Sequence, residues 1–282
     1  MKRILLCTDG STFAQSSYPY ATWFAQGMEA SVDVLYVTDS RGQATAEASN
    51  LSGSIGLGAA ESLLKQLVEV EHERAKLNHQ KAKLILDDAE AAIAAHGTAV
   101  KLIHKTGFLV DCLESLEADV DLIVMGKRGE AADFASGHLG ANVDRIVRSG
   151  HKPCLITPKT VVPMERLLVA YDGSPTGQEL LQFLMDAPNL RNLEIHLLTV
   201  GSSESDAENA RCLAEAKAVL QEAGLSPNAS LQVGETDKAI ARYINDHDIS
   251  LLLMGAYGHR RIRHLVIGST LRSCQIPVLL YR

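Results

Sequence analysis

The chain has 282 residues and a formal net charge of −7, with 46% apolar and 22% charged residues. At about 150 residues per domain this length predicts two domains, and the composition is that of a globular protein rather than a disordered or collagen-like one. Because broad binding to nucleic acid or to anionic membranes needs a basic surface, the acidic balance disfavours both kinds of partner.

The sequence also carries no sign of membrane insertion or secretion. It has no run of 18 apolar residues, so we expect no membrane span. The apolar stretch near the amino terminus meets Asp9 at once, unlike the hydrophobic region of a secretion signal. The five cysteines are scattered and match neither a disulfide framework nor a zinc-binding spacing. These features predict a cytoplasmic protein with reduced thiols and no metal site.

The first element is an apolar run that begins at residue 3 and predicts a strand ending at Asp9, Gly10 and Ser11. A helical pattern follows over 12–26, and a second β-rich run lies at 34–37. Both runs are continuously apolar rather than alternating, which is typical of strands buried on both faces of a parallel sheet. This succession predicts a doubly wound α/β fold, in which ligands bind at the carboxyl ends of the strands.

Residues 42–60 are rich in Ala, Gly and Ser and predict a loop, whereas residues 61–95 predict one long helix. At 1.5 Å per residue this helix would be about 50 Å long if unbroken. Its apolar stripe consists of Leu64, Val68, Ala75, Ala82, Ile85, Ala89 and Ile93. The stripe favours a helix that covers the sheet, and an arm that binds a partner is the alternative.

The rest of the chain repeats its beginning. Residues 166–174 (RLLVAYDGS) match residues 3–11 (RILLCTDGS), and a β-rich run at 197–200 matches 34–37. The apolar strand at 250–255 matches 121–126, and a run before the carboxyl terminus matches 152–156. Four collinear matches predict a duplicated domain, roughly 1–160 and 161–282, with the long helix as an addition to the first copy.

A glycine-rich pattern follows the strand that ends at Gly255, and it reads Gly-x2-Gly-x9-Gly-Ser-Thr. Gly255 and Gly258 allow a ligand to approach the backbone closely. We expect Gly268, Ser269 and Thr270 to open the next helix, whose free N–H groups favour an anion such as phosphate. The last 34 residues contain five arginines and no acid, which agrees with an anionic ligand. The alternative is a plain glycine turn beside a solvated basic face.

Asp-Gly-Ser after the first strand, together with this glycine pattern after the fourth, resembles the universal stress protein family over nearly the whole chain. The resemblance implies two Rossmann-like, doubly wound sheets of five parallel strands in tandem, of the adenine nucleotide alpha-hydrolase-like kind. It implies ATP, alone or with Mg²⁺, at the strand ends, with Asp172 near the ribose and adenine and the backbone of Val200 near the base. The implied phosphate contacts are Gly255, Gly258, Gly268, Ser269 and Thr270. The weaker second set in the first half is Asp9, Val37, Gly126, Gly129 and Gly140.

The resemblance also implies how the two copies associate. In the family the fifth strand often pairs with its copy in a partner. Residues 154–157 and 278–281 are therefore expected to pair within one chain as a pseudo-dimer. Homodimerisation of the whole chain and a protein partner, which the sequence does not identify, remain open.

Both copies depart from the family pattern. In the first, ten residues rather than nine separate Gly129 from Gly140, and Ala141 offers no hydroxyl, so we expect a mainly structural copy. In the second, Pro277 follows Gly268 four residues sooner than Pro153 follows Gly140. Four residues are about one helical turn, which predicts a very short last helix and a weakened phosphate site.

Three hypotheses about function follow. The first is a stress-response regulatory protein that binds ATP in its C-terminal half. The second is a nucleotide-independent scaffold that acts through protein contacts. The third is a slow ATPase. The sequence has no nucleophile and base at a spacing that indicates a catalytic pair, so no catalytic residue is assigned. An enzyme is therefore not the leading expectation.

Overall fold

The computed structural model describes residues 2–39, 57–129, 140–201, 207–256 and 262–282. Their strands form one ten-stranded sheet in the order β3-β2-β1-β4-β5-β10-β9-β6-β7-β8. The strands of the N-terminal half are β1 (Arg3–Thr8), β2 (Ser31–Asp39), β3 (Val100–Gly107), β4 (Leu122–Gly126) and β5 (Cys154–Thr157). Those of the C-terminal half are β6 (Arg166–Ala170), β7 (Glu194–Gly201), β8 (Asn228–Val233), β9 (Leu251–Gly255) and β10 (Val278–Tyr281).

The strands within each half are parallel, and the two halves meet through an antiparallel pair, β5 with β10. In this pair Leu155 lies opposite Leu279. The prediction that the fifth strands pair within one chain is therefore confirmed. The two halves have the same strand order about this pair and run in opposite directions, so the carboxyl ends of their strands lie at opposite edges of the sheet.

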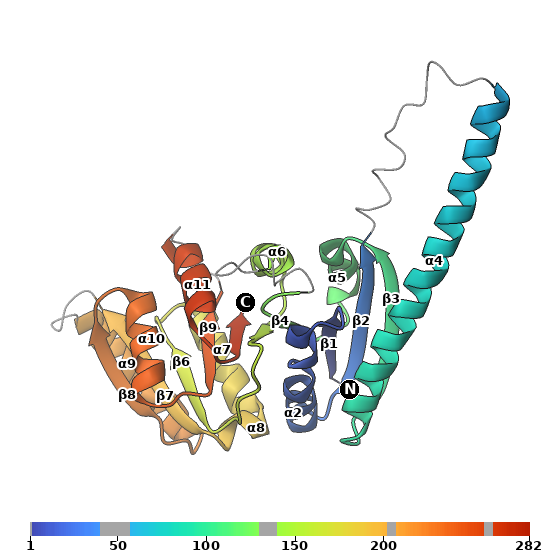
Figure 1. Cartoon of the computed structure of the whole chain (residues 1–282). Coiled ribbons are helices and arrows are strands. Elements are labelled where there is room, and N and C mark those ends of the chain that lie inside the picture. The colour runs from blue at the N-terminus through green and yellow to red at the C-terminus, as the bar shows by residue number, and fades with distance from the viewer. Residues whose placement is uncertain (1, 40–56, 130–139, 202–206, 257–261) are drawn as a thin grey trace.

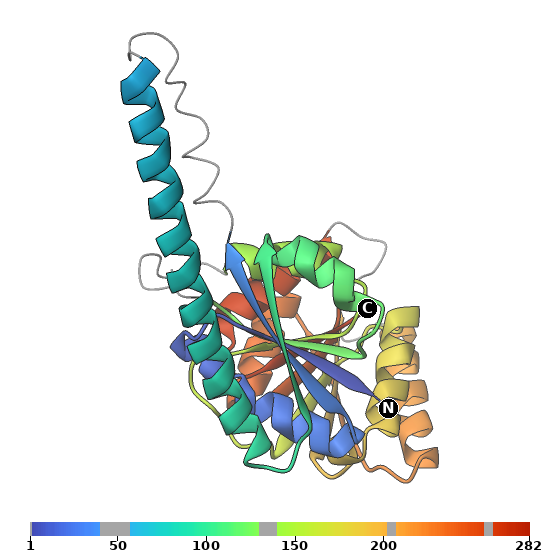
Figure 2. The same ribbon diagram turned by 90° about the vertical axis from the view of Figure 1, so that its right-hand side faces the viewer.

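Helices cover both faces of this sheet (Figures 1 and 2). The helices of the N-terminal half are α1 (Thr12–Gln15), α2 (Tyr18–Met28), α4 (Leu57–Ala94), α5 (Leu109–Glu117) and α6 (Ala141–Ser149). Those of the C-terminal half are α7 (Pro175–Asp186), α8 (Pro188–Arg191), α9 (Ala207–Glu222), α10 (Thr236–Asp246) and α11 (Ile262–Ser273). The predicted helix over 12–26 is divided in two, since Pro19 lies in the first turn of α2 and favours a new helix start there.

Successive residues of the central strands point to opposite faces and enter two separate apolar cores. Leu6 belongs to the core under α2, α4, α7 and α9, whereas its neighbour Leu5 belongs to the core under α5, α6, α10 and α11. Each core contains residues of both halves, so the halves share their apolar interior across the β5–β10 junction.

Two basic side chains connect the halves in a reciprocal way. Nζ of Lys127, which follows β4, donates to the carbonyl oxygens of Arg272 (3.1 Å) and Cys274 (2.9 Å) at the end of α11. Arg282 at the carboxyl terminus donates to the carbonyls of Ile146 and Gly150 at the end of α6. Each half therefore supplies a cation that satisfies the terminal carbonyls of a helix in the other half.

The long helix has two different parts. The C-terminal part of α4 packs on β2, β3 and α2, and its core side chains are Ala82, Leu86, Ala89 and Ile93. One turn earlier, the ring of His79 lies 5.9 Å from that of His104 on β3. Its preceding turns project beyond the body of the molecule (Figures 1 and 2), and Val68 and Ala75 of the predicted stripe are exposed there. The covering helix is thus confirmed only for the C-terminal part of α4. No helix in the described ranges is long and apolar enough to cross a membrane.

Candidate functional site

The carboxyl ends of β6, β7 and β9 bring the predicted ribose, base and first phosphate positions to one edge of the sheet. β6 lies between β7 and β9, and its Ala170 is level with Leu198 and Met254. Asp172 follows the end of β6 by two residues, Val200 is the next-to-last residue of β7, and Gly255 is the last residue of β9. Three of the residues expected in the C-terminal site therefore lie at the carboxyl ends of adjacent parallel strands.

The turn that carries Asp172 is held in place by local hydrogen bonds. Oδ1 of Asp172 accepts from the backbone N–H (3.1 Å) and the hydroxyl (2.6 Å) of Ser174. Ser174 is the N-cap of α7, where its hydroxyl also accepts from the N–H of Gly177 at 3.2 Å. Gly173 between them has φ +73°, a left-handed conformation that glycine adopts without strain. The carboxylate is thus exposed to solvent yet fixed at the strand end.

The glycine turn after β9 leaves more room than its counterpart after β4. A Cβ on Gly255 would lie 3.5 Å from Cγ2 of Thr176, which is ordinary van der Waals contact. A Cβ on Gly126 would lie only 2.6 Å from the carbonyl oxygen of Phe13, the residue that occupies the place of Thr176 in the first repeat. Gly126 is therefore required by close packing within the chain, whereas the chain itself does not require a glycine at 255.

The helix after this turn begins earlier than the sequence predicted. We expected Gly268 to open the helix, and this expectation is wrong, because α11 begins at Ile262 and Gly268 lies in its interior. Ile267 and Leu271, four residues apart on either side of Gly268, both enter the core, so the buried face of α11 continues on the N-terminal side of Gly268. For the same reason the predicted shortening did not occur, and α11 has 12 residues against 9 in α6.

The two hydroxyls expected at the phosphates point to different surroundings. Ser269 is half-buried, and its hydroxyl donates to Oδ2 of Asp237 in the first turn of α10 at 2.5 Å. Thr270 is fully buried, and its hydroxyl has no hydrogen-bond partner among the described residues. Thr270 therefore does not line the strand-end surface in this conformation, contrary to expectation.

Asp237 is a polar neighbour that sequence reasoning did not find. The hydrogen bond from Ser269 is the main cause that lowers the pKa of this carboxyl, and the backbone N–H of Lys238 adds to it. Asp237 reaches Ser269 only because α10 packs against α11, and no spacing in the sequence signals that contact. A carboxylate and a hydroxyl oxygen side by side are the types of ligand that Mg²⁺ prefers.

The remaining parts of the expected C-terminal site differ in what the structure says of them. Gly258, Arg260 and Arg261 lie outside the described residues. Arg272 lies close to Gly268, since a Cβ there would be 3.4 Å from its Nη1. Arg282 is committed to the end of α6, so its charge serves the junction between the halves rather than a nucleotide.

The N-terminal set is brought together but closely packed. Val37 and Asp9 each follow the last residue pair between β2 and β1, Tyr36 with Thr8, by one residue. Oδ1 of Asp9 accepts from the N–H of Ser11 at 3.0 Å, and a Cβ on Gly129 would lie 2.5 Å from Asp9 Oδ2. Gly140 is the N-cap of α6, and its N–H donates to the carbonyl of Lys127 at 3.2 Å.

Cationic side chains also fill the space near the N-terminal set. The guanidinium of Arg128 and Nζ of Lys159 each lie 6.0 Å from the ring centroid of Phe13, within the range of a cation–π interaction. In the C-terminal half the place of Phe13 is taken by Thr176, which has no aromatic ring. The turns after β1 and β6 therefore carry the same Asp-Gly-Ser sequence but have different side chains near them.

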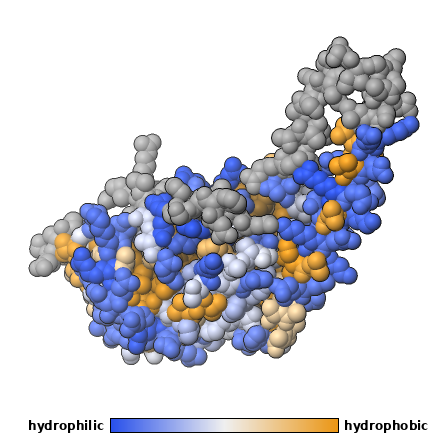
Figure 3. Space-filling view, viewed as in Figure 1, coloured by the Kyte–Doolittle hydropathy of each residue, from blue (hydrophilic) through white to orange (hydrophobic). Residues whose placement is uncertain are grey.

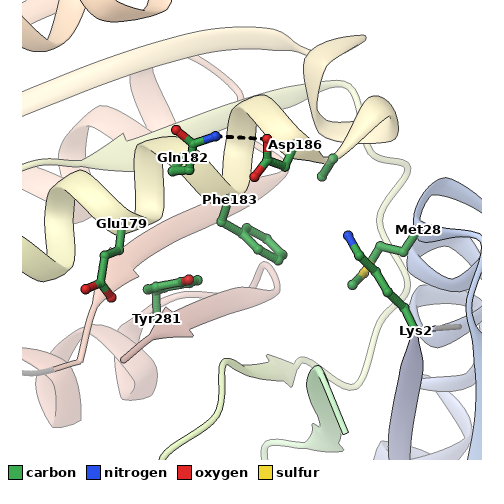
Figure 4. Close-up of a pocket in the computed structure, with 8 residues that line it drawn as sticks. Lys2, Met28, Glu179, Gln182, Phe183, Asp186 and Tyr281 are labelled. Carbon is green, nitrogen blue, oxygen red and sulfur yellow. Dashed lines mark hydrogen bonds between the residues drawn. The ribbon is translucent and has the colours of Figure 1, made fainter.

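A cavity of about 190 Å³ lies elsewhere, between the halves (Figure 4). Its lining residues are Lys2, Met28, Glu179, Gln182, Phe183, Asp186, Ala187 and Tyr281. Burial, with Glu179 and Asp186 nearby, raises the pKa of Tyr281. None of the residues expected at a nucleotide lines this cavity, and its two carboxylates disfavour a phosphate.

Known proteins agree with this architecture. The sequence model of the universal stress protein family matches residues 1–158 and 202–282. A universal stress protein of Synechocystis sp. (strain ATCC 27184 / PCC 6803 / Kazusa) is 55% identical over 287 residues, which cover 100% of both chains.

Solved structures agree in fold. The crystal structure of a universal stress protein from Archaeoglobus fulgidus DSM 4304 is 21% identical with a TM-score of 0.75, covering 99% of this chain and 97% of that one. A functionally unknown protein from Pseudomonas aeruginosa PAO1 is 15% identical with a TM-score of 0.62, covering 99% and 92%. The fold, the repeated strand-end motifs and the match of sequence along both halves lead to one conclusion: the chain belongs to the universal stress protein family.

Proposed function

We propose that this member of the stress-response family binds an adenine nucleotide, ATP with Mg²⁺, in its C-terminal half, and that the N-terminal half is mainly a structural copy. The observation that carries the proposal is the strand-end arrangement of Asp172, Val200 and Gly255. There a fixed, exposed carboxylate and Gly255 lie at the ends of adjacent strands, and among the described residues a Cβ on Gly255 would meet only the side chain of Thr176 within 4 Å.

Each of these residues has a chemical use for a nucleotide. The carboxylate of Asp172 accepts hydrogen bonds from ribose hydroxyls, and the backbone at Val200 offers donors and acceptors to the base. The backbone N–H groups at Gly255 and Gly258 contact phosphate oxygens, and Gly268 lets the ligand approach α11. Ser269 and Asp237 are the oxygen pair where Mg²⁺ would join the phosphates, whereas buried Thr270 takes no part.

The contrast with the N-terminal half supports an unequal pair of sites. Asp9 packs against Gly129, and the backbone of Phe13 occupies the space beside Gly126. A ligand there would have to displace backbone rather than the methyl end of a side chain. Because backbone atoms move less readily than side-chain ends, the N-terminal turn is the poorer nucleotide site.

Calorimetric titration with Mg-ATP tests the proposal through a matched pair of variants. Asp172→Asn removes the charge that would accept ribose hydroxyls, so we expect the Kd to rise about tenfold or more. Asp9→Asn makes the same change at the equivalent turn of the N-terminal half and is expected to leave the Kd within about twofold of wild type. Both variants keep an oxygen that accepts from the following serine, so their unfolding temperatures serve as a folding control.

Two results would overturn the proposal. One is the absence of binding heat at millimolar Mg-ATP, and the other is a loss of affinity in Asp9→Asn but not in Asp172→Asn. Release of phosphate, measured on the same samples, tests the hypothesis of slow ATP hydrolysis.

A nucleotide-independent scaffold is the second candidate function. It is favoured by one observation, namely that the hydroxyl of Ser269 is donated to Asp237 and not directed to an open phosphate site. The shared sheet and the reciprocal contacts of Lys127 and Arg282 would give such a scaffold its rigid form. This candidate would be favoured if the wild-type protein shows no binding heat in the titration and still unfolds in a cooperative thermal transition.

A further inference from the structure

The projecting part of α4 exposes apolar side chains to a degree that is unusual for a monomer. Leu67, Val68, Val70, Leu77 and Leu84 are 39%, 69%, 63%, 62% and 72% exposed. Figure 3 shows hydrophobic residues among hydrophilic ones along this helix. From residue 65 to residue 81 every residue is exposed except half-buried Glu71 and Asn78. A run of exposed apolar residues on a rigid element marks an interaction surface.

Most of these apolar residues share one seam of the helix. The seam consists of Leu67, Val70, Arg74, Leu77, Lys81 and Leu84, spaced alternately by three and four residues. This alternation is the a and d spacing of a coiled coil, which keeps one face turned toward a partner helix. Val68 lies outside the seam, and so do the core residues Ala82 and Ala89 of the same helix. The seam therefore remains available while α4 packs on the sheet with another side.

We infer that the α4 seam binds the α4 seam of a second copy of the chain in antiparallel orientation. In a parallel pair each a residue faces its own copy, so Lys81 would face Lys81 inside the seam. In the antiparallel pair Leu67 faces Leu84, Val70 faces Lys81 and Arg74 faces Leu77. Leucines then meet at both ends of the seam, and like charges do not face each other.

Charges beside the seam favour the same orientation. An acidic segment with Glu69, Glu71 and Glu73 precedes a basic segment with Lys81 and Lys83. The antiparallel pair places Lys81 of each copy beside Glu71 and Glu73 of the other, so opposite charges adjoin at both ends. Lys81 faces its own copy in the parallel pair and Val70 in the antiparallel pair, so this residue distinguishes the two orientations.

The length of the seam fits a helix pair between two bodies. From residue 67 to residue 84 the helix rises by about 26 Å, and its core side chains begin at Ala82. The overlap thus uses mainly the projecting turns of both copies and reaches Leu84, which is exposed on the first turn that packs on the sheet. The β5–β10 junction is already occupied within the chain, so α4 offers an association surface that does not compete with it.

Sedimentation equilibrium over a range of protein concentrations tests the association, with three substitutions that introduce the same charge. Wild type is expected to reach twice the 30.4 kDa mass of the chain. Val70→Glu and Leu77→Glu place a charge in the seam and are expected to raise the dimer Kd at least tenfold. Val68→Glu changes an equally exposed valine outside the seam and should leave the Kd within about twofold. All three positions are exposed, so an unchanged unfolding temperature confirms that the variants fold.

Disulfide trapping tests the orientation, in a Cys212→Ser background that removes the half-buried native cysteine. The antiparallel pair brings Leu67→Cys of one copy to Leu84→Cys of the other, so a mixture of the two variants should form a mixed disulfide. Neither variant should cross-link with itself, because equal positions would lie about 26 Å apart along the helix. A chain that stays monomeric at every concentration, equal effects of Val68→Glu and Val70→Glu, or self-cross-linking of each single variant would overturn the inference.

Discussion

Ser269 of α11 donates its hydroxyl to Oδ2 of Asp237 at the start of α10, at a distance of 2.5 Å. This bond joins two neighbouring helices of the C-terminal half at the residue that the sequence assigned to phosphate. It lowers the pKa of the Asp237 carboxyl below the ordinary value of 3.8. A carboxyl whose folded pKa is lowered adds stability above its unfolded pKa, and this stability is lost as the pH falls through the folded pKa.

Replacing Ser269 by Ala should raise the pKa of Asp237 toward its ordinary value, because the largest cause of the shift is removed. The loss of stability at pH 7 should be below about 1 kcal/mol, since solvent weakens a hydrogen bond that lies near the surface. Titration of the Asp237 carboxyl by NMR gives the pKa directly. An unchanged pKa in Ser269→Ala would show that the bond does not persist in solution.

The equivalent glycines at the ends of β4 and β9 should respond differently to the same substitution. Gly126→Ala would bring a Cβ to 2.6 Å from the Phe13 carbonyl oxygen, so α1 must shift, at a cost of about 1–3 kcal/mol. Among the described residues Gly255→Ala meets only the side chain of Thr176, at 3.5 Å, and its stability should stay within about 0.5 kcal/mol of wild type. Thermal unfolding of the two variants side by side checks this. Equal decreases in Tm would mean that the two turns are packed alike.

The contact of Lys127 with α11 should contribute strongly to the junction between the halves. Its amino group is buried, which lowers its pKa, and it satisfies the carbonyls of Arg272 and Cys274. Lys127→Met keeps the aliphatic length but leaves those carbonyls without this donor, at a cost of about 1–3 kcal/mol. Lys101→Met, on an exposed position of β3, is the matched control. A decrease in Tm no larger than that of the control would contradict this role.

The sequence predicted the features of the fold that local patterns encode. Continuously apolar runs such as 121–126 are recognisable because strands buried on both faces exclude polar residues, and the repeat of Asp-Gly-Ser located the turns at Asp9 and Asp172. The pairing of β5 with β10 followed from the resemblance to a family and not from any pattern in those short strands.

The features that sequence reasoning missed depend on contacts between distant elements. The start of α11 was misplaced because Gly268 looked like a helix opening, while the burial of Ile267 and Leu271 extends the helix ahead of it. Asp237 and Lys127 act on partners more than 30 residues away, and the chemistry of a single Asp or Lys gives no hint of such a partner. The apolar stripe of α4 was recognised from its spacing. That spacing does not show that the core side chains of the stripe begin only at Ala82.

His196 should make the stability of the C-terminal half depend on pH. The imidazole is buried on β7, with Nδ1 at 3.0 Å from the Tyr243 hydroxyl and Nε2 at 3.1 Å from Oε1 of Glu194. Burial lowers its pKa below 6.5, His247 and Arg166 act in the same direction, and Glu194 opposes them. Well above pH 6.5 the imidazole is neutral in both the folded and the unfolded state. As the pH falls below 6.5 the unfolded chain binds the proton first, so folding is destabilised.

The measurement is the unfolding temperature between pH 7 and pH 5, a window that stays above the ordinary pKa of the neighbouring Glu194 carboxyl. Wild type should lose stability across this window, and His196→Gln, which cannot bind a proton, should show a shallower pH slope even if its Tm at pH 7 is lower. His96→Gln, an exposed histidine in the N-terminal half, should keep the wild-type slope. If His196→Gln keeps that slope as well, another group controls the pH dependence, because a side chain that does not titrate contributes no proton linkage.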